Sequence, residues 1–162
     1  MIVRTAADTM KTELLARRWD GLSSSEVVFA TGSVLVTEAP VELVLASVRT
    51  PAALIRIGPS VSDPEEPTLI VQTFGVVTAV AVPGDAFGQN AMMGANQQAN
   101  SSRGRGLLEV EEEVKATLAY LDQDQSMQVV SYSSGDDGAV YIEEIGYVAY
   151  REYKIDAQLA TT

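Results

Sequence analysis

The segment from Thr68 to Val82 constrains the fold most, because it is apolar on both faces of an extended chain. One face would carry Leu69, Val71 and Val77, and the other would carry Ile70, Phe74, Val76, Val80 and Val82. A strand that is apolar on both sides is typical of the middle of a sheet with a covering layer on each face. We therefore expect a central strand here.

Two helices are predicted from apolar residues that recur at spacings of three and four. In Gly106–Leu121 the stripe is Leu107, Val110, Val114, Leu118 and Leu121. In Thr5–Trp19 it is Ala7, Met10 and Leu14, flanked by Leu15 and Trp19, with Gly21 as the stop. Thr37 to Pro40 would open a third, shorter helix with Thr37 as its cap, and its stripe would be Val41, Val44, Leu45 and Val48.

The remaining strands predict the fold class. They are Val27–Val36, broken at Gly32, then Ala52–Ile57, Met127–Ser133 and Ala139–Ile155, with a bulge at Gly146. Turns are expected at Pro59–Pro67 and, as a hairpin turn, at Ser134–Gly138. We predict an α+β fold: a mostly antiparallel sheet, one long helix packed across it, and a shorter N-terminal helix.

Residues 1–162 are expected to form a single domain with two irregular segments. Pro83 to Arg105 has no visible period, which predicts a long flexible loop, and loops of this length are usually functional or disordered. Met92 and Met93 sit in its middle as an apolar pair with no local core to join. Residues 156–162 are predicted to be a frayed tail.

Composition excludes several classes of function. The chain has no Cys and no His, which rules out disulfides, thiol catalysis, Cys/His zinc sites and Ser-His-Asp chemistry. Its net charge is −11, opposite in sign to that of proteins that coat nucleic acid or bind anionic membranes. No apolar run approaches the length of a membrane span, and the first residues lack a signal-peptide core, so a protein without membrane contact is expected.

Carboxylates are the only plentiful catalytic-type groups, and none forms a convincing site. Neighbours in the run Glu111 to Glu113 point in different directions on a helix, which favours a solvated face. Asp136 and Asp137 lack the further ligands of a calcium loop. Gly104-Arg105-Gly106 lacks the rest of a phosphate-binding motif. We therefore expect no enzyme activity, no cofactor and no metal, although a carboxylate-dependent enzyme stays open as an alternative.

The positive signals indicate assembly. Gly106 to Glu144 holds ten acidic residues and one basic residue, so this surface should attract basic partners. Arg17 with Arg18, and Arg103 with Arg105, are the basic clusters, which could pair with a neighbouring subunit. A Tyr-rich final strand could extend a sheet across a subunit boundary. The candidate interface residues are Met92, Met93, Arg103, Arg105, Tyr147, Tyr150 and Tyr153.

The order of elements resembles that of the tail terminator, or tail completion, proteins of long-tailed bacteriophages. The features that carry the resemblance are the helix Thr5–Trp19, the strand Thr50-Pro51-Ala52-Ala53-Leu54-Ile55-Arg56-Ile57, the long strand Leu69–Val82, a central loop, the helix Leu107–Leu121, and a closing hairpin that ends in Gly146-Tyr147-Val148-Ala149-Tyr150-Arg151-Glu152-Tyr153.

The resemblance implies a homohexameric ring in the virion tail, present in the host cytoplasm during assembly. Such rings cap the last ring of tail-tube protein, stop tube growth and present a surface to the head-tail connector protein, while DNA passes through the lumen. An acidic lumen wall, with Glu109, Glu112 and Glu113 as candidates, would let DNA slide. Two alternatives stay open: another connector or tube protein, and an acidic inhibitor or immunity-type protein that binds a basic partner.

Overall fold

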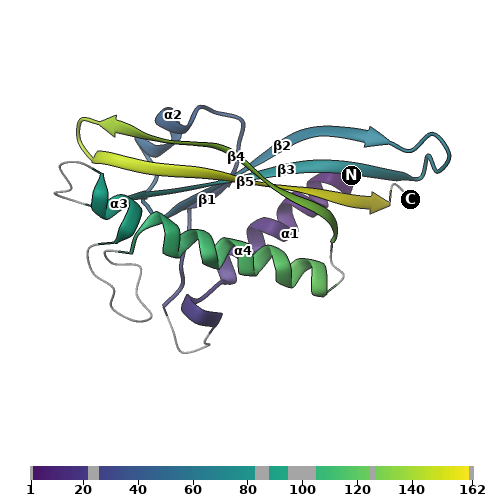
Figure 1. The fold of residues 1–162 in the computed structure, drawn as a ribbon, viewed down its shortest axis with the longest axis horizontal. Helices are drawn as coiled ribbons and strands as arrows, with labels where there is room; N and C mark the ends of the chain where they lie inside the picture. Colours follow the sequence, from purple (N-terminus) through teal and green to yellow (C-terminus); the bar gives the residue numbers. More distant parts are fainter. Residues whose placement is uncertain (1, 22–25, 83–87, 95–104, 125–126, 161–162) are drawn as a thin grey trace.

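The fold is built on a five-stranded sheet in which β3 lies at the centre (Figure 1). The structure is a computed structural model that describes residues 2–21, 26–82, 88–94, 105–124 and 127–160. The strands are β1 (Val34–Val36), β2 (Ala52–Ser62), β3 (Leu69–Ala81), β4 (Gln128–Ile142) and β5 (Gly146–Ala160), in the spatial order β1-β2-β3-β5-β4. Only the β1–β2 pair is parallel; the other neighbours run antiparallel.

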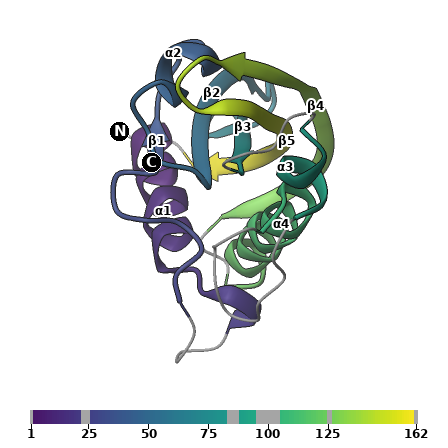
Figure 2. The same cartoon turned by 90° about the vertical axis from the view of Figure 1, so that its left-hand side faces the viewer.

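Helices cover the two faces of this sheet unequally. The long helices α1 (Ile2–Ala16) and α4 (Leu107–Gln123) lie side by side on one face, whereas the short α2 (Val41–Leu45) lies on the other (Figure 2). Two further short helices are η1 (Trp19–Gly21) and α3 (Gln89–Met93). The predicted α+β class, with a mostly antiparallel sheet and a long helix across it, is confirmed.

The main core fills the space between α1, α4 and the sheet. The predicted α4 stripe is buried in full, and Ala7, Met10 and Leu14 are the buried face of α1. From β3, Phe74, Val76 and Val80 point into this layer, while Val77 and Ala79 pack on the opposite face with α2. The central strand is therefore covered on both sides, as predicted from the apolar residues on both of its faces.

The hairpin between β4 and β5 differs from the prediction. Ser134 to Gly138 lies inside β4, where the register shifts between Ser134 and Asp137, and the turn comes later, at residues 143–145. Gly146 is the residue that closes this turn and not a bulge; its φ of 100° is one that glycine adopts without a steric penalty. The predicted hairpin turn was wrong because a bulge absorbs the same Gly-Asp-Asp-Gly residues inside a continuous strand.

The predicted frayed tail is also wrong over residues 156–160. These residues extend β5 alongside the start of β3, and Ala157 and Leu159 are buried in the main core. The alternation of Ile155, Ala157 and Leu159 is a period-two pattern that predicts this strand. Residues 161 and 162 lie outside the described residues.

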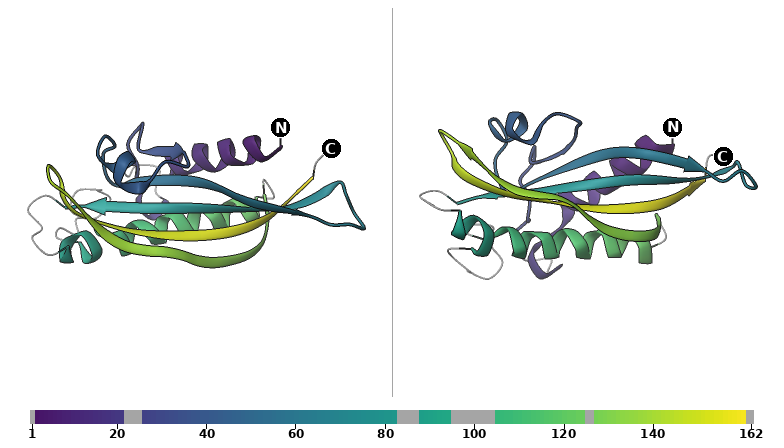
Figure 3. Two further views of the ribbon diagram at one scale, coloured as in Figure 1. Left: turned by 90° about the horizontal axis from the view of Figure 1, so that it is seen from above. Right: turned by 45° about the horizontal axis from the view of Figure 1, so that its top comes forward.

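Two other strands have different limits from those expected. β2 continues through Gly58 and Pro59 to Ser62, past a bulge, so the exposed loop is shorter than Pro59–Pro67. The β2–β3 hairpin extends past the helices at one end of the molecule (Figure 3). Only Val34–Val36 of the expected Val27–Val36 strand joins the sheet, because the chain turns at Gly32, where φ is 89°.

The segment from Pro83 to Arg105 contains one described element, the helix α3. Ala91 of α3 is fully buried, and Met92 packs against the main core, so the apolar pair is divided: Met93 is 56% exposed. The expectation that this pair has no core to join was wrong for Met92. Residues 83–87 and 95–104, including Arg103 and most of the predicted flexible loop, lie outside the described residues.

Candidate functional site

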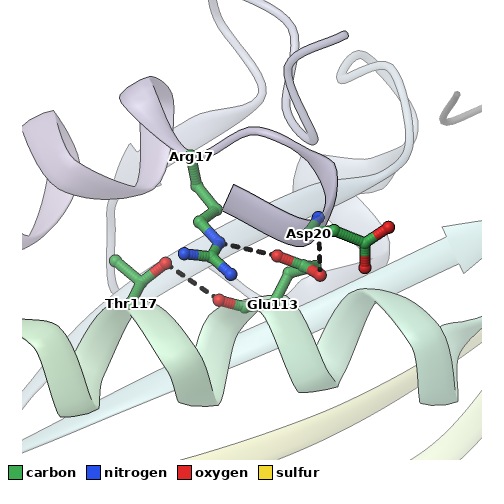
Figure 4. Close-up of polar contacts among 4 residues, drawn as sticks. All are labelled: Arg17, Asp20, Glu113 and Thr117. Carbon is green, nitrogen blue, oxygen red and sulfur yellow. Dashed lines mark hydrogen bonds and ion pairs between the residues drawn. The ribbon is translucent and has the colours of Figure 1, made fainter. Parts of the chain in front are cut away.

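Three glutamates of α4, Glu109, Glu111 and Glu113, form ion pairs with basic side chains of the same chain. Figure 4 shows Glu113 beside the end of α1: the Nε of Arg17 donates to its Oε2 at 2.6 Å. The backbone N–H of Asp20 donates to the other oxygen at 3.2 Å. Glu113 is 8% exposed, so this ion pair joins α1 and η1 to α4 away from water.

Glu111 and Glu109 are held in the same way. Glu111 is 5% exposed and lies 2.9 Å from Lys115 Nζ and 3.5 Å from Arg151 Nη1, which ties α4 to β5. Glu109 forms an ion pair with Arg105, whose guanidinium lies 5.1 Å from the centre of the buried Trp19 ring. Arg17 and Arg105 therefore form ion pairs within the chain, and their role at a subunit interface stays a prediction.

The predicted solvated glutamate face was wrong for Glu111 and Glu113. Both residues border the apolar stripe, one on each side, whereas Glu112 lies opposite it and is exposed. Glu109, Glu112 and Glu113 were the candidates for an acidic lumen wall. Glu109 and Glu113 form ion pairs within the chain, and Glu112 is the one of the three with an exposed side chain. Position relative to the stripe was the sequence signal that could have separated them.

The candidate tyrosines of β5 are half-buried, and they contact tyrosines of β4 or residues of the helices α2 and α4. Tyr153 stacks on Tyr132, with ring centres 5.9 Å apart, and Lys115 lies over its face. Tyr147 meets Tyr141 edge to face at 5.2 Å. Tyr150 packs with the residues of α2. Their role as interface residues stays a prediction.

The outer edge of β4 has no strand beside it among the described residues. β4 is the last strand of the sheet, and only β5 lies beside it. An open edge presents unpaired N–H and C=O groups that can pair with another chain. Sequence reasoning missed two exposed apolar residues on β4, Val130 at 52% and Tyr132 at 42%, whereas Tyr141, at 61%, belongs to the Tyr-rich strand that it singled out. The alternation of Val130 and Tyr132 with serines was the available signal.

The opposite edge of the sheet is covered only in part. β1 pairs with Ala53 to Ile55, and the N–H of Ile57 donates to the carboxylate of Glu38. Beyond that point, residues 60–62 of β2 have no second strand beside them in the described part of the chain, and Val61 is 68% exposed. The sheet is thus open on both sides at the end where β2 meets β3.

Asp156 links strands close to this open end. Its two carboxylate oxygens accept hydrogen bonds from the hydroxyls of Thr73 on β3 and Ser131 on β4, each at 2.6 Å. The hydrogen bond from Ser131, followed by that from Thr73, holds the pKa of Asp156 below its usual value of 3.8. The carboxylate is therefore a clamp across three strands.

Among the described residues, no group of three or more acidic side chains is placed so that it could hold a metal ion. None of the helices in the described ranges is both long and apolar enough to cross a membrane. No protein-family model matches this chain, and no curated protein matches it either.

Proposed function

We propose that this chain is a structural protein of a phage virion tail, a tail terminator whose copies close into a hexameric ring. The ring would cap the tail tube, stop its growth and form the joint to the head-tail connector protein, with DNA passing through the lumen. The resemblance in element order supports the family, and the two open sheet edges support self-assembly.

The observation that carries this proposal is the arrangement of those edges. Residues 60–62 of β2 lie level with the start of β4 at residues 128–129, on the opposite side of the sheet, and residues 130–134 follow along the same open edge of β4. Because three successive antiparallel pairings separate them, β2 and β4 run antiparallel to each other. A copy related by rotation could therefore set its β4 beside β2 in the antiparallel sense, and such head-to-tail contacts close into rings when the rotation closes.

The lumen would be lined by exposed acids of the β2–β3 loop rather than by the flank of α4. Exposed carboxylates are carried there by Asp63, Glu65 and Glu66. A wall of this kind offers no phosphate-binding site, so DNA can slide along it. A ring in which basic residues line the hole would contradict this placement.

Light scattering and negative-stain imaging of the purified full chain test the proposal. We expect uniform single rings, and we expect Val61→Asp to dissolve them because it puts a charge into the contact. Leu43→Asp is the matched control, since Leu43 is 67% exposed but lies on α2. Long tubes would instead indicate a tube protein. Monomers that bind a basic protein tightly would indicate the acidic inhibitor, and monomers with turnover would indicate the enzyme; each of these outcomes overturns the ring.

A further inference from the structure

We propose a second docking surface, at the other end of the sheet from the ring contact: the edge of β4 over residues 138–142 binds an extended basic peptide segment of a partner protein. The peptide would add a strand to the sheet beside β4. This surface goes beyond the proposed ring, because its occupant is a different chain.

The edge itself is open and free of charge. Residues 138–142 pair on one side with β5, from Tyr150 to Gly146, and on the other side no described strand lies beside them. Ala139 is exposed and Tyr141 is 61% exposed, so a strand placed here would find an apolar and aromatic surface beside it. Strand addition to such an edge draws affinity from main-chain hydrogen bonds and specificity from side chains.

The charged residues around this edge determine which kind of peptide strand can bind there. Two pairs of exposed carboxylates bracket this edge, Asp136 with Asp137 at one end and Glu143 with Glu144 at the other. Along an extended chain Asp137 and Glu143 are about 20 Å apart, at roughly 3.3 Å per residue. The matching occupant has an apolar or β-branched centre with Lys or Arg near both ends.

The same charges argue against a second copy of this chain as the occupant. Each copy carries −11, and β4 paired antiparallel with itself over residues 138–142 would set Asp136 and Asp137 of one copy opposite Glu144 and Glu143 of the other. Like charges set opposite one another across a strand pair are destabilising. An acidic or neutral partner strand would gain the hydrogen bonds but lose the electrostatic attraction at both ends.

A designed peptide provides the probe. It has nine residues, acetylated and amidated, with two lysines at each end and alternating valine and threonine between them. We expect it to bind the full-length protein at low salt, as measured by fluorescence anisotropy, and to slow amide hydrogen exchange in residues 138–142. Two comparison peptides carry glutamates in place of the lysines, or proline at the central position. We expect the first not to bind and the second to bind at least tenfold more weakly, because proline removes a main-chain donor.

Charge variants of the protein complete the test. Asp136→Asn with Asp137→Asn should weaken binding of the lysine peptide about fivefold to tenfold, since charges at the rim of an interface contribute modestly. Asp63→Asn with Glu65→Gln is the matched control in the β2–β3 loop and should leave binding unchanged. All these residues are exposed, so the fold should tolerate the changes. Equal loss in both double variants, equal binding of the proline peptide, or no exchange protection over 138–142 would overturn the proposal, whether or not rings form.

Discussion

The role of each glutamate in the first turns of α4 depends on the side of the helix on which it lies, as shown by Glu109, Glu111, Glu112 and Glu113. Glu111 and Glu113 flank the apolar stripe of α4, so the helix carries them under the sheet and under α1, where each meets a basic side chain. Glu112 faces away and stays in water. At this scale the residues that suggest carboxylate chemistry serve instead to fix α4 against three other segments.

Removing one partner of a buried ion pair leaves the other charged and unpaired. We therefore expect Glu113→Ala to lower the free energy of unfolding by about 3 kcal/mol, because Arg17 and the N–H of Asp20 lose their acceptor. Urea unfolding followed by the fluorescence of Trp19, the single tryptophan, measures the change. Glu112→Ala is the control and should stay within about 0.5 kcal/mol. Equal effects of the two substitutions would mean that the ion pair contributes nothing.

The clamp at Asp156 predicts a pH dependence of stability. Its pKa in the folded protein is below 3.8, so its contribution to stability is fully present above pH 3.8 and is lost as pH falls through the lowered pKa. Ser131→Ala should raise the pKa of Asp156 toward 3.8, as read by carboxyl ¹³C NMR. The variant should be less stable than the wild type at about pH 7, and the difference should shrink at about pH 2.5. Ser133→Ala, on the same strand, should leave this titration unchanged.

At the scale of the elements, a close approach of α3 and α4 explains where the long helix begins. A Cβ on Gly106 would lie 2.3 Å from the backbone nitrogen of Gly94 and 2.6 Å from the carbonyl oxygen of Met92. Backbone atoms cannot move aside as a flexible side chain can. Gly106 is therefore the point at which the end of α3 packs against the start of α4, and it brings the buried Ala91 into the core.

Gly106→Ala should lower the free energy of unfolding by about 1–3 kcal/mol through overpacking. Its φ is −90°, so steric crowding is the cause and not backbone strain. Gly146→Ala makes the contrasting case: nothing lies within 4 Å of its Cβ, but φ is 100°, and we expect a loss of about 1 kcal/mol from strain. Urea denaturation of both variants, with amide exchange of residues 89–93, separates the two causes. Unchanged exchange in α3 of the Gly106→Ala variant would contradict the packing argument.

At the scale of the whole molecule, repulsion between negatively charged copies opposes the proposed ring, whereas strand pairing at the open sheet edges favours it. Six copies at −11 each carry −66, and the β2–β3 loop that flanks the contact holds three exposed acids. Salt screens such repulsion, with a Debye length of about 10 Å at roughly 0.1 M. The strand contact itself is uncharged, since neither 60–62 nor 130–134 contains a charged residue.

Ring formation should therefore strengthen with ionic strength. Raising NaCl from about 0.05 M to about 0.5 M should shift the molar mass measured by light scattering toward the hexamer, because screening weakens repulsion and leaves hydrogen bonds intact. The β4 peptide complex should respond in the opposite sense and weaken, since it depends on attraction between unlike charges. A ring that dissociates as salt is added would show that ionic attraction, and not strand pairing, holds the copies together.

The sequence by itself determined the fold class, the central strand and the long helix, because each depends on a regular spacing of apolar residues that can be read directly along the chain. It also placed the interior stripes of α1 and α4 correctly, and a period-two reading of Ile155, Ala157 and Leu159 would have added the end of β5. These features follow from which side chains must leave water.

Only the tertiary structure decided which charged residues are buried, where β4 turns into β5, and which strand edges stay open. Glu113 is buried because the end of α1 supplies Arg17 from far along the chain, a partner that no local pattern reveals. The Gly-Asp-Asp-Gly run can form either a turn or a bulge, and β5 selects the bulge by pairing along the full length of β4. Open edges are a property of strand order, which is set when the whole sheet assembles.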